Sequence, residues 1–140
     1  MKSQFSHVVL IAGLTLFGSL SLNAQTKAGA TVPFIFQANH YAFSPGDYTL
    51  EQAGANTPGR FQLTEKSTGH SIFVTIPIPK DKKNYEEGHL TFACNDGDCV
   101  LAQVALPNSN LVYARSDSSI EKDMDRKLGM TAMVNVKLTK

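Results

Sequence analysis

Tryptophan is absent from the 140-residue sequence, and cysteine occurs only twice. The 13 basic and 12 acidic residues nearly balance, which excludes the concentrated positive field that binding to a nucleic-acid backbone requires. The chain also has no G-x-S-x-G nucleophile elbow, no phosphate-binding P-loop and no dinucleotide-binding glycine fingerprint. The sequence therefore predicts no cofactor, no nucleic-acid partner and no recognisable set of catalytic residues.

The first residues have the form of a secretory leader. A positively charged start precedes Val8–Leu22, fifteen residues without a charged side chain, whereas a transmembrane helix needs about 20 apolar residues. We expect a signal peptide cleaved after Ala24, with Ala30 as the alternative site, and an uncleaved anchor is the weaker interpretation. No cysteine directly follows the apolar run to accept a lipid, since the first is Cys94. The mature domain, residues 25–140, is predicted to be periplasmic or extracellular, with no transmembrane span.

Short segments of alternating apolar and polar residues, separated by turn residues, are typical of an all-β fold. We expect one β-sandwich of seven or eight strands, jelly-roll-like or immunoglobulin-like. Tyr41–Phe43 adds a short extended piece, and Ile72, Val74, Ile76 and Ile78 form the expected core face of the strongest strand. The expected strands are Thr31–Ala38, Tyr48–Glu51, Arg60–Glu65, Ser71–Ile78, His89–Cys94, Cys99–Leu106, Leu111–Arg115 and Thr131–Leu138.

One segment near the C-terminus has helical periodicity. Ser118 and Glu121 match a capping box, in which two side chains satisfy backbone N–H groups at the start of a helix. Ile120, Met124 and Leu128 recur every four residues and form one apolar stripe. We expect a short helix that begins at Ser118 and packs on the domain through this stripe.

The two cysteines flank a turn. Asp96-Gly97 between two alternating runs is a strong hairpin signal, and it places Cys94 opposite Cys99 at a spacing that permits a disulfide. An exported domain favours that bridge, with free thiols and redox or metal chemistry as the alternatives. His89 lies five positions before Cys94 and therefore points to the opposite face, so no metal site is predicted.

Two segments carry a family resemblance. VPFIFQANHYAFSPGDYTL (Val32–Leu50) resembles a group of exported proteins, abundant in Acidobacteria, whose mature chains begin VPF-x-F followed by P-A/G-G-x-Y. LTFACNDGDCVLAQV (Leu90–Val104) is similar to a later segment of the same group. The resemblance implies an extracellular β-rich fold and assigns no activity.

Three residues are candidates for ligand binding. Phe73 lies opposite the expected core face of its strand, and Tyr113 and Arg115 share a face of a later strand. Aromatic side chains among hydroxyls are typical of a sugar- or peptide-binding platform, whereas cover by a helix or a second sheet would place them in the core. We expect a non-enzymatic binding, adhesive or structural module of the bacterial cell envelope, with an unidentified glycan or protein partner.

Two other classes of protein stay open. A small secreted hydrolase with a carboxylate-based site would need acids from distant strands to converge, which the sequence alone does not show. A small outer-membrane β-barrel needs strands of about 9 to 11 residues and aromatic girdles. Most of the alternating runs here are shorter, and tryptophan is absent.

Overall fold

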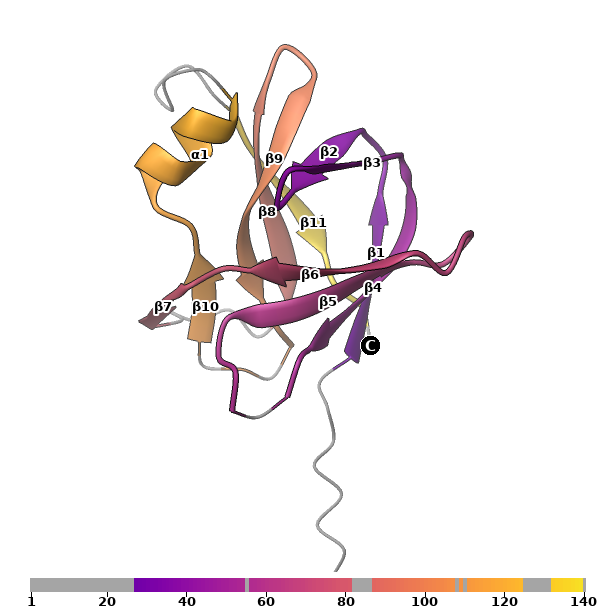
Figure 1. Cartoon of the computed structure of the whole chain (residues 1–140), viewed down its shortest axis with the longest axis vertical. Helices are drawn as coiled ribbons and strands as arrows, with labels where there is room; N and C mark the ends of the chain where they lie inside the picture. The colour runs from indigo at the N-terminus through magenta and orange to yellow at the C-terminus, as the bar shows by residue number, and fades with distance from the viewer. Residues whose placement is uncertain are drawn as a thin grey trace, which may run out of the picture.

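Two β-sheets and one helix make up the part of the chain that the structure describes (Figure 1). The computed structural model describes residues 27–54, 56–81, 87–107, 109, 111–124 and 132–139. The predicted signal peptide and Leu128 of the predicted helical stripe lie outside these residues, as does the side chain of Ile78.

The first sheet has four antiparallel strands in the order β1-β4-β5-β6. These strands are β1 (Lys27–Val32), β4 (Gly46–Gln52), β5 (Arg60–Glu65) and β6 (Ser71–Thr75). The second sheet has the order β11-β8-β9-β10-β7, with β2 joined to β9 and β3 joined to β2. Its strands are β2 (Phe36–Ala38), β3 (Tyr41–Phe43), β7 (Ile78–Asp81), β8 (His89–Asn95), β9 (Asp98–Ala105), β10 (Leu111–Ala114) and β11 (Ala132–Lys137). Helix α1 spans Asp117–Met124, and the predicted all-β fold with one short helix is confirmed.

The described strands number eleven, more than the seven or eight predicted, because two expected strands are each divided and the short piece Tyr41–Phe43 forms β3. The predicted strand Thr31–Ala38 separates into β1 and β2 around Pro33, and the predicted strand Ser71–Ile78 separates into β6 and β7 around Pro77. Proline has no backbone N–H to donate to a strand ladder, so each proline is a point at which pairing stops. At both points the chain passes from the first sheet to the second.

The core lies between the sheets and follows the predicted alternation. On β4, Tyr48 and Leu50 are fully buried, and on β5 the buried residues are Phe61 and Leu63. Alternate side chains of a strand point to opposite faces, so these four form one apolar surface. Each such side chain contributes roughly 1.5–3 kcal/mol when it leaves water.

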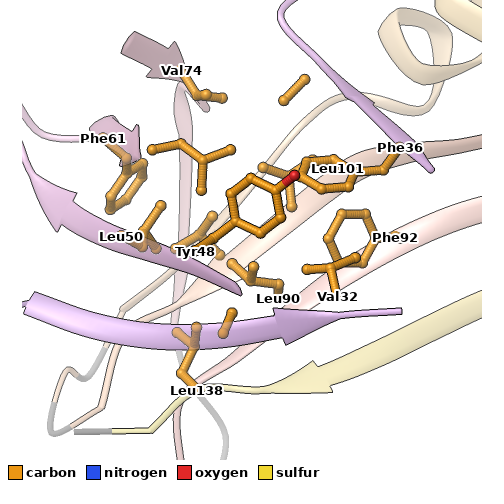
Figure 2. Packing of buried hydrophobic residues seen from close by; sticks show 14 of the residues in the cluster. Val32, Phe36, Tyr48, Leu50, Phe61, Val74, Leu90, Phe92, Leu101 and Leu138 are labelled. Atoms are coloured by element: carbon orange, nitrogen blue, oxygen red, sulfur yellow. The ribbon is translucent and has the colours of Figure 1, made fainter. Parts of the chain in front are cut away.

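Tyr48 lies at the centre of this core. Figure 2 shows its ring among apolar side chains from both sheets. The ring of Phe36 meets Tyr48 edge-on at 5.3 Å between centroids and meets Phe92 at 5.1 Å. The Tyr48 hydroxyl donates a hydrogen bond to the carbonyl of Ser44, which satisfies the one polar group of the ring. Burial, and secondarily the negative charge of Glu65, raise the pKa of Tyr48 above its ordinary value.

The β8–β9 hairpin contains the predicted disulfide. Asp96 and Gly97 both have positive φ, at 48° and 88°, as the two central residues of a type I′ turn require. This turn pairs Cys94 with Cys99 at a Cα–Cα distance of 4.1 Å, and their sulfur atoms are bonded. The disulfide prediction is confirmed.

Helix α1 begins earlier than predicted. Its cap is Ser116, whose Oγ accepts a hydrogen bond from the backbone N–H of Ser119 at 3.3 Å, and whose carbonyl accepts bonds from the same N–H and from that of Ile120. The predicted start at Ser118 is therefore wrong, because a serine two residues nearer to β10 occupies the capping position.

The predicted helical stripe does pack on the domain. Ile120 and Met124 are buried against the outer face of β8 and β9, which leaves both faces of these strands covered. Figure 1 shows α1 beside the upper part of these strands. The residues beneath the helix are small, which lets it approach closely: Ala93, Val100 and Ala102.

Candidate functional site

A pocket of about 270 Å³ lies where β6 of the first sheet diverges from β9 and β10 of the second. We call it the inter-sheet pocket. Its apolar wall comes from β6, the β6–β7 bend and β9, through Val74, Pro77 and Leu101. Its polar side comes from the β2–β3 turn, the end of β6, the start of α1 and the helix itself: Asn39, His40, Thr75, Arg115, Ser116, Ser119 and Asp123.

An ion pair forms the polar centre of the pocket. Arg115 Nη2 lies 2.6 Å from Asp123 Oδ2, and these side chains are only 13% and 8% exposed. The same nitrogen donates to the Oγ and the backbone carbonyl of Ser119, at 2.7 and 3.1 Å. Arg115 has further N–H donors on Nη1 and Nε, for which the described residues provide no partner. As far as the described residues go, those donors are open to a ligand.

An irregularity in β9 positions Arg115. Thr91 of β8 pairs with Gln103 and Phe92 pairs with Leu101, so Ala102 is left without a partner on β8. Such a bulge bends its strand and re-aims the neighbouring residues. The carbonyl of Ala102 accepts the backbone N–H of Arg115 at 2.9 Å. This bond ties the start of the helix to the point at which β9 leaves β10 and approaches β2.

The β2–β3 turn contributes two polar side chains. Asn39 and His40 are its central residues and have φ of 50° and 68°, the positive values that a type I′ turn needs. Asn39 Nδ2 donates to the carbonyl of Phe73 on β6 at 3.3 Å, and His40 Nδ1 lies 3.6 Å from Asp123 Oδ1 on α1. The turn therefore bridges β6 and the helix across the mouth of the pocket.

The three predicted binding residues do not share one surface. Phe73 is 47% exposed on the outer face of the first sheet, where the guanidinium of Arg60 lies 4.2 Å from its ring centroid. Tyr113 is 5% exposed and packs edge-on against Phe61, so it belongs to the core and is excluded from the predicted platform. Arg115 alone lies in the inter-sheet pocket.

Sequence reasoning missed Asn39, His40 and Asp123. The two turn residues carried a signal, because asparagine between two short alternating runs favours a tight turn with positive φ. Asp123 carried none, since its neighbours Asp117 and Glu121 are equally acidic and only the fold shows which carboxylate faces Arg115.

The described residues contain neither a cluster of metal ligands nor a membrane-spanning helix. No group of three histidine, cysteine, aspartate or glutamate side chains lies close enough to hold a metal ion in the described ranges. No helix of the described part is long and apolar enough to cross a membrane.

Comparison with known proteins found no matching family model, no similar curated protein and no similar solved structure.

Proposed function

We propose that this protein is an exported, non-enzymatic binding module of the bacterial cell envelope, and that its ligand occupies the inter-sheet pocket. The observation that carries the proposal is the buried Arg115–Asp123 pair at one side of a pocket whose opposite wall is apolar. Ligand sites commonly combine an apolar lining with a few fixed polar groups that orient the ligand. Three contacts hold Arg115 in place, so the pocket is organised before a ligand arrives.

The same contacts favour binding over turnover. Glycoside hydrolysis uses two carboxyl groups about 5 to 9 Å apart, whereas Asp123 is the sole carboxylate among the described residues that line the pocket. Asp123 is also engaged by Arg115. A serine nucleophile would need a histidine hydrogen-bonded to it as its base. Here His40 lies next to the Asp123 carboxylate, and the Ser119 Oγ accepts a hydrogen bond from Arg115. This arrangement does not form a serine–histidine pair.

Export through a cleaved leader is part of the proposal, and β1 supports one of the two cleavage sites. Ala30 is buried in β1 and pairs with Tyr48, so cleavage after Ala30 would remove most of a core strand. Cleavage after Ala24 would leave β1 complete. We expect intact-mass analysis of the exported protein to show loss of residues 1–24, and a full-length chain in the inner membrane would contradict export.

The binding proposal is tested with purified protein, a glycan array and a pull-down from cell-envelope extract. Asp123→Asn and Arg115→Met are expected to lower retention at least tenfold while the circular-dichroism spectrum stays unchanged. Arg60→Met is the matched control, because it removes an exposed guanidinium on the outer face of the first sheet. Turnover of glycoside, ester or peptide substrates that Asp123→Asn abolishes would instead show a hydrolase.

A further inference from the structure

Among the described strands only β5 pairs with β6, so the outer edge of β6, next to the inter-sheet pocket, has no partner strand there. Two backbone hydrogen bonds lie at the two ends of the β5–β6 ladder and show which residue pairs are hydrogen-bonded. At one end the Glu65 N–H donates to the His70 carbonyl at 2.9 Å, and at the other the Ile76 N–H donates to the Gly59 carbonyl at 2.7 Å. Hydrogen-bonded and non-hydrogen-bonded pairs alternate along an antiparallel ladder. With the observed register, the N–H and C=O groups of alternate β6 residues therefore point away from β5: those of Ser71, Phe73 and Thr75.

One of these outward groups already has an amide partner. The carbonyl of Phe73 accepts a bond from the side-chain Nδ2 of Asn39 at 3.3 Å. A primary amide has the same donor group as a backbone peptide, so Asn39 occupies the place that a peptide N–H of an added strand would take. No described strand other than β5 pairs with β6.

The edge leads directly into the pocket. Thr75 is both the last residue of β6 and, like Arg115, a lining residue of the inter-sheet pocket. A strand added along Phe73 and Thr75 would point alternate side chains to the two faces of the sheet. The inward side chains would meet the free N–H donors of Arg115, and the outward ones would lie beside the exposed ring of Phe73.

We propose that the ligand is an extended polypeptide segment that adds to the free edge of β6, displaces the amide of Asn39 and places a carboxylate or amide side chain against Arg115. The proposal rests on the proposed function and names the chemistry of its partner. Main-chain bonds to the edge supply affinity in this mode of recognition, and the pocket supplies preference for alternate side chains. The segment preferred here alternates apolar residues with aspartate, asparagine, glutamate or glutamine.

A second copy of the domain does not fit this edge. If two β6 strands paired in antiparallel fashion about Phe73, each Phe73 carbonyl would need to bond to the other copy. In each copy, however, the β2–β3 turn already places Asn39 on that carbonyl. The turn is held from two sides, by Asn39 on β6 and by His40 beside Asp123 on α1. A single extended segment has to replace only the amide group of Asn39.

The test uses a library of acetylated and amidated pentapeptides with alternating apolar and polar positions, measured by NMR on the intact domain. Binding is expected to slow hydrogen exchange at the backbone N–H of Phe73 and Thr75, which face outward. The N–H groups of Ile72 and Val74 already pair with β5 and are expected to change little. N-methylation of the peptide should abolish binding at the positions facing β6 and leave it intact at the alternate positions.

Three variants make the test specific. Thr75→Pro removes an outward N–H without removing a ladder bond and is expected to weaken peptide binding at least tenfold, whereas the matched control Thr75→Val keeps the N–H and the affinity. Asn39→Gly keeps the positive φ of the turn and removes the competing amide, so affinity should rise about fivefold, the equivalent of one net hydrogen bond.

The outcomes separate this inference from the proposed function. Peptide binding with no change at the outward N–H groups would overturn the added strand. A glycan that binds through Arg115 and Asp123 while all peptides fail would also overturn it and would leave the binding module standing. If neither peptides nor glycans bind, both proposals are wrong.

Discussion

The two sheets meet along two seams that are closed by different means. At the first seam, β1 meets the C-terminal segment through the backbone, because Gly29 N–H donates to the Thr139 carbonyl at 2.7 Å and Thr139 N–H donates to the Gly29 carbonyl at 2.8 Å. Gly29 permits this approach, since a Cβ there would lie 3.0 Å from Thr139 Oγ1. At the second seam, β6 diverges from β9 and β10, and side chains from the β2–β3 turn and α1 span the gap.

The difference shows how a small two-sheet domain makes room for a ligand. Pairing at the first seam uses main-chain groups, and the close approach at Gly29 leaves no space between the strands. At the second seam, Asn39 donates to a backbone carbonyl of β6 and His40 lies beside Asp123 of α1, and all three side chains line the inter-sheet pocket. Under the proposed function, the first seam serves stability and the second serves binding.

Among the variants that test the difference between the two seams, Phe36→Ala is expected to have the largest effect on stability. Phe36 anchors the β2–β3 hairpin by stacking on Phe43 and by edge contacts with Tyr48 and Phe92. Loss of this fully buried ring should lower the free energy of unfolding by about 3 to 5 kcal/mol. It should also loosen the turn at the second seam. Urea unfolding measures the first effect, and exchange of the Asn39 side-chain amide protons, which donate to the Phe73 carbonyl, measures the second. A loss below about 1 kcal/mol would show that the hairpin is not anchored by this ring.

The next effect is expected from Asp123→Leu, which leaves the mostly buried guanidinium of Arg115 without its carboxylate. Breaking such a pair from one side should cost about 3 kcal/mol, whereas the double variant Arg115→Leu/Asp123→Leu should recover a large part of the loss. Both variants should lose ligand binding. Equal stability of Asp123→Leu and the double variant would show that the unpaired guanidinium of Arg115 is not the source of the loss.

A change at the first seam is expected to have a smaller effect, and to alter the stability of the domain without altering ligand binding. Thr139→Pro removes the N–H that donates to the carbonyl of Gly29 and should lower the free energy of unfolding by about 1 kcal/mol. Ligand affinity should be unchanged within experimental error. A loss of binding in this variant would refute the division of roles between the two seams.

The smallest effect is a difference in alkaline stability between the wild type and Tyr48→Phe. The pKa of Tyr48 is raised in the folded state, so its contribution is fully present below the unfolded value of about 10 and is lost as the pH rises above it. Between about pH 9 and about pH 11, wild-type stability should fall more steeply than that of the variant. Parallel urea-midpoint curves for the two proteins would contradict this assignment.

Local chemistry was predictable from the sequence. The Asp96-Gly97 signal for a type I′ turn predicted that Cys94 and Cys99 pair across the hairpin, because a two-residue turn sets the register of its own strands. Alternation also predicted β4 and β5, whose buried residues lie two positions apart.

Non-local contacts were not predictable in the same way. Asn39, Arg115 and Asp123 come from three separate segments, and nothing in one sequence shows that a bulge at Ala102 brings them together. Pro77 marked the end of pairing, but the continuation of the chain into the other sheet depends on the whole topology. The resemblance to exported acidobacterial proteins stays a prediction.

The first seam also constrains the order of folding. Gly29 and Thr139 are separated by 110 residues, so their pairing closes a loop that includes almost the whole described domain. The entropy of closing a loop rises with its length, and contacts between distant residues slow folding. Synthesis from the N-terminus releases Gly29 from the ribosome long before Thr139. Until Thr139 emerges, the edge of β1 lacks this partner, and the first seam stays open.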